Sequence, residues 1–287
     1  MRLFAISDLH VGHPKNRAAL GELPHHPNDW LILGGDIGET VEHLDAAFDC
    51  AQERFAKVLW VPGNHELYST PKDPCTLRGV ARYEHLVRHC QARGVVTPED
   101  PYIEWPGEGP PTIIAPLFLL YDYSFAPDGM NPEQARVWAR EAGIVSTDER
   151  YLHAEPFASK EAWCAERLQL TRQRLATQVP DGHRLVLINH WPLRRDLIRL
   201  FRIPRFTPWC GTTATETWHT ELPVDVVVSG HLHMRATDWR DGVRFEEVAL
   251  GYPRHWRQAQ GIAHYVRQIL PGPPTPLDGW AGPIWHR

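Results

Sequence analysis

Five apolar runs in this 287-residue chain are each followed, within a few positions, by side chains that can bind a metal ion. Each run is a nearly continuous stretch of aliphatic and β-branched residues, which is typical of strands buried on both faces. The runs are RLFAIS, DWLILGG, KVLWVPG, HRLVLI and VDVVVSG, and the polar residues after them are Asp8, His10, Asp36, Asn64, His190, His231 and His233. Loops from several strands converge at one edge of an open α/β sheet, so the sequence predicts that these seven side chains meet in one place.

The types of these side chains indicate which ions they would bind. Imidazole, carboxylate and amide oxygen together suit divalent Mn, Fe, Zn or Co better than Ca or a thiolate zinc site. Seven ligands are too many for one tetrahedral ion, but they suit two ions that share a bridging carboxylate. Two ions about 3.5–4 Å apart can hold a phosphate group and activate a water for in-line attack. The pattern therefore predicts two divalent metal ions (Mn, Fe or Zn) and hydrolysis of a phosphate ester.

The stretch VPGNHELYS places Asn64, His65 and Glu66 side by side where an apolar run ends at Pro62 and Gly63. Gly-Asn is common in turns, so this stretch taken alone is typical of a turn after a strand. A single histidine at any of the other strand ends is also most often structural. Five such strand ends in one chain favour a shared functional site over five separate caps.

In this order, DLH, GGD, GNHE, a lone histidine after an apolar run, and GHLH resemble the signature of the calcineurin-like metallophosphoesterase family. The resemblance spans most of the chain and implies an α/β fold: an αββα sandwich of two mixed β-sheets flanked by helices, with a dinuclear metal site at the strand ends. It implies that Asp36 bridges the two ions and that the catalytic His65 faces the phosphate as a general acid or electrostatic stabiliser. It also implies the remaining ligands, which are Asp8, His10 and His233 for the first ion and Asn64, His190 and His231 for the second.

One stretch departs from a related pattern. The protein Ser/Thr phosphatases of this superfamily carry an Asp-Arg pair soon after the bridging aspartate, in GDxVDRG. Here the corresponding residues are Gly35-Asp36-Ile37-Gly38-Glu39-Thr40. We interpret those partners as missing, which argues against close kinship with the protein phosphatases.

The segments between the motifs must form the elements that position them. Residues 39–56 have the pattern of an amphipathic helix, with Val41, Leu44, Phe48 and Phe55 on one face. Residues 76–94, 133–143 and 160–178 also have helical patterns, and the Asp-Gly pair of WRDGVRF predicts a hairpin. For residues 98–131 we expect short strands and loops that roof the site.

The chain shows no internal repeat and no second core. We therefore expect one metallophosphoesterase domain over residues 1–270, followed by a Pro-rich C-terminal tail over residues 271–287. The tail begins with PGPPTP, a stiff segment, and we expect the rest to be ordered only where its tryptophans dock.

The composition argues against several partners. The net charge of −5 and the isoelectric point near 6.4 provide no general attraction for nucleic acid or anionic membranes. No apolar run approaches the roughly 18–20 residues of a membrane span, and the start MRLFAIS is too short for a signal peptide. Five cysteines without CxxC spacing indicate free thiols, so we expect a cytoplasmic protein. The sequence leaves the oligomeric state unknown.

The segment after His190 is the most informative about the substrate. It is rich in arginine in an otherwise acidic protein, and within the segment only Asp196 opposes the positive charge. A solvated helix face would account for the cluster; the functional interpretation is a positive, substrate-binding lip that steers an anionic substrate or an acidic partner. The arginines are Arg194, Arg195, Arg199, Arg202 and Arg205.

The stretches RIPRF and WCGT, with the later EEVALGYPRHW, resemble the actinobacterial phosphopantetheinyl hydrolases. Those enzymes remove 4′-phosphopantetheine from acyl carrier proteins, which are acidic. The resemblance implies a phosphodiesterase whose substrate is a holo acyl carrier protein.

Three alternatives stay open. The same metal site would serve a phosphomonoesterase or cyclic-nucleotide phosphodiesterase acting on a small phosphorylated metabolite or nucleotide. A nuclease would fit the metals, but the acidic balance and the lack of a long basic stripe count against it. A non-enzymatic scaffold would typically have lost a ligand or His65, and none is missing.

Overall fold

Two β-sheets pack face to face in the computed structural model, which describes residues 1–71, 73–274 and 282–286. The four-stranded sheet has the order β10 (Arg267–Leu270), β1 (Leu3–Ile6), β2 (His26–Leu33), β3 (Phe55–Trp60). The seven-stranded sheet has the order β11 (Ile284–Trp285), β8 (Ala236–Arg240), β9 (Val243–Glu247), β7 (Val224–Ser229), β6 (Arg184–Ile188), β5 (Thr112–Pro116), β4 (Ile103–Glu104). Both sheets are mixed, with β1, β2 and β3 parallel in the first and β5, β6, β7 and β9 parallel in the second.

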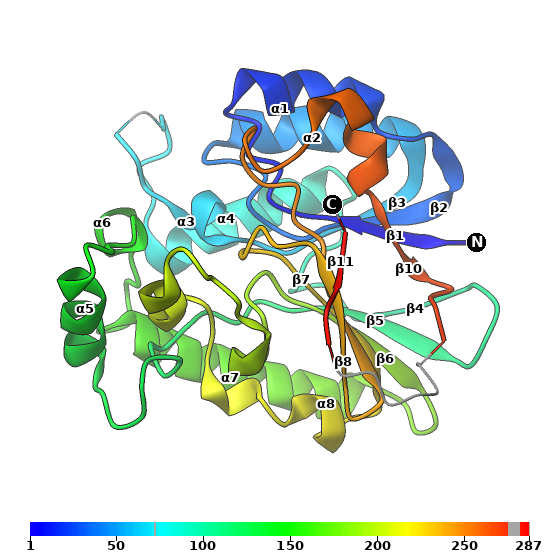
Figure 1. Ribbon diagram of the computed structural model, residues 1–287. Coiled ribbons are helices and arrows are strands. Elements are labelled where there is room, and N and C mark those ends of the chain that lie inside the picture. The colour runs from blue at the N-terminus through cyan, green and yellow to red at the C-terminus, as the bar shows by residue number, and fades with distance from the viewer. Residues whose placement is uncertain (72, 275–281, 287) are drawn as a thin grey trace.

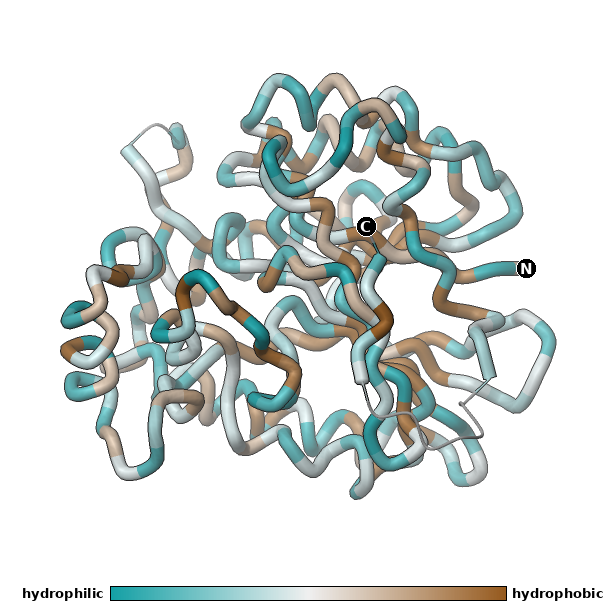
Figure 2. The backbone as a smooth tube through the Cα atoms, viewed as in Figure 1, coloured by the Kyte–Doolittle hydropathy of each residue, from teal (hydrophilic) through white to brown (hydrophobic). Residues whose placement is uncertain are grey.

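Alternate residues of each strand enter different cores. Along β1, Leu3 and Ala5 join the core between the two sheets, whereas Phe4 and Ile6 face the helices outside the first sheet. Successive side chains of a strand point to opposite faces, so a strand covered on both faces must be apolar throughout. This explains why the five runs of the sequence show no alternation. In Figure 2 apolar stretches of the chain concentrate in the strands of the two sheets.

Helices cover the outer face of each sheet (Figure 1). Helices α1 (Pro14–Ala19), α2 (Val41–Arg54) and α4 (Gly79–Ala92) lie on the side of the first sheet, and α7 (Lys160–Gln178) and α8 (Trp218–Glu221) lie on the side of the second. The short helices α3 (Asn64–Leu67) and α6 (Asp148–Tyr151) and the helix α5 (Pro132–Glu141) lie at one end of the sandwich. The αββα sandwich expected from the sequence is confirmed.

Most of the expected elements are present, with shifted ends. Helix α7 has the predicted bounds, and α2, α4 and α5 fall within or close to the predicted ranges. Phe55 is an exception, because it begins β3 instead of extending the helix. The predicted hairpin joins β8 to β9, and both turn residues, Asp241 and Gly242, have the positive φ that a tight two-residue turn requires.

The described part of the tail returns to the second sheet. Ile284 and Trp285 pair with Thr237 and Ala236 of β8. Residues 275 and 276 of the expected PGPPTP segment, and Trp280, lie outside the described residues. All five cysteines are free thiols. A search of the described residues finds no helix long and apolar enough to cross a membrane.

Candidate metal centre and active-site cleft

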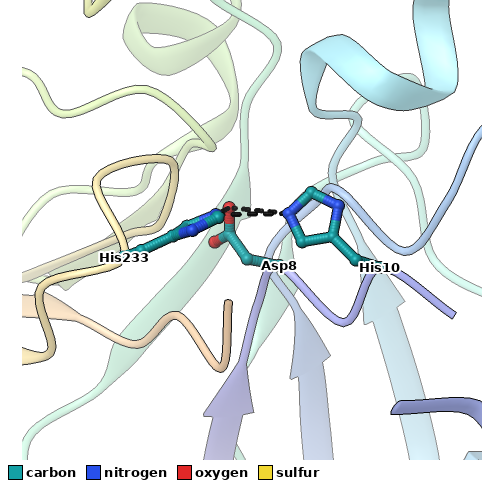
Figure 3. Close-up of side chains that lie close together, drawn as sticks. All are labelled: Asp8, His10 and His233. Atoms are coloured by element: carbon teal, nitrogen blue, oxygen red, sulfur yellow. Dashed lines mark hydrogen bonds and ion pairs between the residues drawn. The ribbon is translucent and has the colours of Figure 1, made fainter. Parts of the chain in front are cut away.

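Asp8, His10 and His233 converge from two distant parts of the chain (Figure 3). Asp8 and His10 follow β1, and His233 follows β7. The His233 Nε2 atom lies 3.0 Å from Asp8 Oδ1 and 3.2 Å from His10 Nε2. One carboxylate oxygen and two imidazole nitrogens thus surround a single position, and this donor set suits a borderline divalent ion.

Asp36, His190 and His231 form a second group beside the first. The Asp36 Oδ2 atom lies 3.5 Å from His190 Nε2 and 3.9 Å from His10 Nε2, so this one oxygen faces both groups. The structure therefore places Asp36 where a bridging carboxylate would have to be.

Three buried atoms near this second group have no hydrogen-bond partner among the described residues: Asn64 Oδ1, His190 Nε2 and His231 Nε2. Leaving a buried polar atom unpaired normally costs about 1–3 kcal/mol. Each of the three is a lone-pair donor, so a divalent cation would satisfy them together. The residues present thus fit a second metal ion, as well as the first.

The pKa values of the two histidines of the second group are shifted in opposite directions. Burial, together with the charge of His190, lowers the pKa of His231 to about 3, so its imidazole is neutral at neutral pH, as a ligand must be. Burial alone would lower the pKa of His190, but the carboxylates of Asp36 and Asp8 raise it to about 10. A metal ion at His190 therefore has to displace a proton.

The backbone at the strand ends is strained. Asp8, His10, Asp36, His231 and His233 all have positive φ, between 43° and 71°, a region that residues other than glycine seldom adopt. Such conformations cost about 1–3 kcal/mol each and cluster at functional sites. Gly63 and Gly230 let these loops approach one another, because a Cβ at either position would lie within 2.4 Å of a carboxylate oxygen of Asp36 or Asp8.

Glu66, which had no role from the sequence, anchors Asp36. Its carboxylate is fully buried and accepts hydrogen bonds from the backbone N–H groups of Asp36 (2.9 Å), Ile37 (2.7 Å) and Gly63 (2.9 Å). Glu66 therefore ties the loop after β2 to the loop after β3 and holds Asp36 in its strained conformation.

His65 has an acidic partner that the sequence did not single out. Its Nδ1 atom lies 3.0 Å from Glu39 Oε1, and its Nε2 atom lies 3.9 Å from Asp36 Oδ2. The Asp-Arg pair of GDxVDRG is absent, but Glu39 is the third residue after Asp36, which is the position of the aspartate in that pattern. Burial alone would lower the pKa of His65, but the carboxylates of Asp36 and Glu39 raise it to about 9.

Asn64 is oriented by a residue that the sequence did not single out. Its amide nitrogen donates to Tyr68 Oη (2.9 Å) and to Asp148 Oδ1 (3.0 Å), and Tyr68 Oη donates to the same oxygen of Asp148 (2.6 Å). Both amide protons are thus engaged, which leaves Asn64 Oδ1 as the atom of this side chain that could bind a metal ion. Asp148 itself is only 1% exposed.

On the other side, His255 and Tyr252 support the first group. His255 Nδ1 lies 2.9 Å from His233 Nδ1, and Tyr252 stacks on His10 with ring centroids 4.3 Å apart. Such contacts fix the orientation of a ligating imidazole. Both residues belong to the stretch EEVALGYPRHW.

A cleft of about 400 Å³ opens above both groups. Asp36, Asn64, His65, His231 and His233 line its floor, and the residues that line its walls are 145–148, Leu200, Arg202, Ile203, Phe206, Tyr252, Arg254 and His255. The segment 98–131, which we expected to roof the site, contributes none of the described residues that line this cleft.

The structure does not bring the five arginines of the expected lip together at the cleft. Only Arg202 lines the cleft, and it is exposed. The other four have carboxylate partners, mostly distant in sequence: Arg194 with Asp196 (2.8 Å), Arg195 with Asp128 (2.9 Å), Arg199 with Asp238 (2.7 Å) and Arg205 with Glu141 (3.1 Å).

Comparisons with known proteins agree with this fold. A model of the calcineurin-like phosphoesterase family matches residues 1–235. The chain is 48% identical over 273 residues to the [acyl-carrier-protein] phosphodiesterase PptH of Mycobacterium tuberculosis, and the alignment covers 94% of this chain and 84% of that protein. The crystal structure of phosphopantetheinyl hydrolase (PptH) from M. tuberculosis superposes with a TM-score of 0.89 at 47% identity, covering 95% of this chain and 96% of that one.

Proposed function

Because the chain belongs to the calcineurin-like phosphoesterase family, we propose that it is a dinuclear metal-dependent phosphodiesterase that removes 4′-phosphopantetheine from holo acyl carrier proteins. The observation that carries this proposal is the 48% identity, over 94% of the chain, to a relative described as an acyl-carrier-protein phosphodiesterase. The site described above is complete for such chemistry, since every predicted ligand lies in one of the two groups or faces them.

The proposed ligands of the first ion are Asp8, His10 and His233, those of the second are Asn64, His190 and His231, and Asp36 bridges. Divalent ions such as Mn, Fe or Zn would supply Lewis-acid chemistry here, by neutralising charge on the phosphate oxygens and activating a water. The chain's own part is to fix the ligands: Glu66 holds the backbone of Asp36, Asp148 orients Asn64, and His255 orients His233.

His65 is the proposed general acid. Its Nδ1–H donates to Glu39, which leaves the protonated Nε2 facing the cleft at the side of Asp36. As a water oxygen bonds to phosphorus and the bond between phosphorus and the serine oxygen of the carrier breaks, Nε2 gives its proton to that serine oxygen, and the products are free 4′-phosphopantetheine and a serine hydroxyl. A pKa of about 9 keeps His65 protonated at neutral pH, as this role requires.

For substrate binding, the arginines expected from the sequence take different parts. Arg202 is the one that can meet an anionic substrate at the cleft, because it lines the cleft and is exposed. Arg199 and Arg205 bind carboxylates of their own chain at either end of the loop that carries Arg202. We propose that they fix the conformation of this loop. Arg194 and Arg195, in contrast, stabilise the fold through their ion pairs and do not contact the substrate.

The test is intact-mass analysis of a holo carrier protein after incubation with the enzyme loaded with Mn²⁺. The expected result is conversion to the apo carrier with release of 4′-phosphopantetheine. An unchanged carrier mass, together with brisk hydrolysis of p-nitrophenyl phosphate or bis(p-nitrophenyl) phosphate, would overturn this substrate and favour a small phosphorylated metabolite or nucleotide instead.

A further inference from the structure

Exposed apolar side chains gather at the mouth of the cleft. Of the eight large hydrophobic side chains that are exposed among the described residues, three lie here: Phe201 (79% exposed), Val145 (66%) and Ile203 (42%). Val145 precedes α6, whereas Phe201 and Ile203 lie between the 3₁₀ turns Arg195–Leu197 and Pro204–Trp209. With Arg202 they form what we call the mouth patch. Exposed apolar groups beside a functional site are typical of protein–protein contacts.

The loop that carries the mouth patch is held in place from both sides. Arg199 makes a two-pronged ion pair with Asp238, at 2.7 and 2.8 Å, and Arg205 donates to Glu141 and to the backbone carbonyl of Trp138. Leu200 and Phe206 turn inward and pack against a small core that contains Leu232. In Figure 2 this loop, yellow-green in Figure 1, carries both apolar and polar stretches. Because its ends are fixed, the loop presents Phe201 to solvent as a preformed contact.

A small substrate cannot account for Phe201. Leu200, Arg202 and Ile203 line the cleft, but Phe201 does not. A ligand that fits within the cleft would therefore leave the most exposed of these side chains in water. A partner with a body larger than the cleft would cover Phe201, Ile203 and Val145 together as its reacting group enters.

Charge indicates what kind of partner this is. Neither Arg202 nor Arg254, on the opposite wall of the cleft, has a carboxylate partner within the described parts of the chain. The chain as a whole carries a net charge of −5, so an acidic partner would be repelled elsewhere and attracted at the mouth. A second copy of this chain fits less well, because a two-fold contact through the mouth patch would bring the arginines of both copies together.

We infer that the mouth patch docks the carrier protein itself, with Phe201 in an apolar spot of the carrier and Arg202 against its acidic groups, while the phosphodiester enters the cleft. This inference rests on the proposed function. It assigns the carrier contact to a mixed apolar and cationic patch centred on Phe201, and not to a row of arginines.

The test compares kcat/KM on holo carrier with kcat/KM on bis(p-nitrophenyl) phosphate for Phe201→Ala and Arg202→Glu. Each variant should lower the ratio of kcat/KM on holo carrier to kcat/KM on the small diester by about 10- to 30-fold, the scale of an interface hot spot. The matched controls are Ile284→Ala, another exposed apolar residue, and Arg88→Glu, an exposed arginine that lines a different groove. Both controls should keep the wild-type ratio.

The other possible outcomes can be told apart from one another. An unchanged ratio in both variants, with carrier conversion by the wild type, would overturn the docking surface and leave the proposed function standing. No conversion by the wild type would overturn both. A dimer in light scattering that Phe201→Ala dissociates, with no change in the ratio, would assign the patch to self-association.

Discussion

The floor of the cleft is held by buried hydrogen bonds, whereas its mouth presents an exposed side chain on a loop tied by ion pairs. On the floor, Asp36 is 2% exposed, and its strained backbone is fixed by the fully buried Glu66. At the mouth, Phe201 is 79% exposed on a loop whose ends are tied by Arg199 and Arg205. Buried polar contacts in a low dielectric are costly to break, whereas an exposed side chain such as Phe201 can be changed at little cost to the fold. The floor is therefore suited to the chemistry common to all substrates, and the mouth to the choice among them.

The most severe test of this division is Asp36→Asn. Losing the carboxylate that faces both groups should remove bound metal and lower hydrolysis of every ester by about 10³-fold or more, since metal ions supply several kcal/mol of transition-state stabilisation. Metal content by mass spectrometry and rates on the small diester and the holo carrier would measure this. Full activity in this variant, or in metal-stripped protein, would refute the dinuclear site.

His65→Ala separates proton transfer from metal binding on the same floor. The variant should keep two bound ions and its melting temperature while losing about 10²–10⁴ in turnover, the usual scale for an acid–base group. The loss should be smaller for esters with an activated leaving group, which need little protonation. If the variant instead loses a metal ion, the role assigned to His65 is wrong.

Asp148→Ala tests a residue that connects the two regions. Asp148 contacts Asn64 on the floor, and it belongs to the same segment as Val145 of the mouth patch. Without Asp148, the amide of Asn64 loses one of its two acceptors, so the affinity of the second ion should fall about 10- to 100-fold, the usual effect of a residue that orients a ligand. Metal titration followed by mass spectrometry would measure it, independently of activity.

Two variants serve as comparisons for Asp148→Ala. Asp148→Asn keeps an acceptor oxygen and should restore most of the affinity, and the metal-free melting temperatures of both variants show whether the fold is intact. If Asp148→Ala binds two ions as tightly as the wild type, the orientation of Asn64 does not depend on Asp148.

The same division explains what the sequence could predict. The floor residues follow apolar runs directly, so local patterns place them at strand ends, and the order of the motifs implies the fold. Partners that are distant in sequence are invisible to such patterns: Asp148 lies 84 positions from Asn64, and Asp238 lies 39 from Arg199. This is why the arginines looked like one lip, although four of the five have carboxylate partners in their own chain. Glu39 was overlooked for a different reason. It has the same spacing from Asp36 as the second aspartate of GDxVDRG, which was a usable signal, but it is a glutamate and the pattern has an aspartate.

The smallest expected effect comes from Glu39→Gln, because the Glu39 side chain is 38% exposed and water screens its charge. Burial lowers the pKa of His65, while Asp36 and Glu39 raise it, to about 9. The acid form of His65 is present below that pKa and is lost as pH rises through it. Removing the Glu39 charge lowers the pKa, so activity should fall at a lower pH than in the wild type and stay unchanged well below both pKa values. A pH–rate profile on the small diester measures this shift, with Glu42→Gln, a nearby carboxylate that pairs with Arg17, as the control. An equal loss at every pH would mean instead that Glu39 only orients the imidazole.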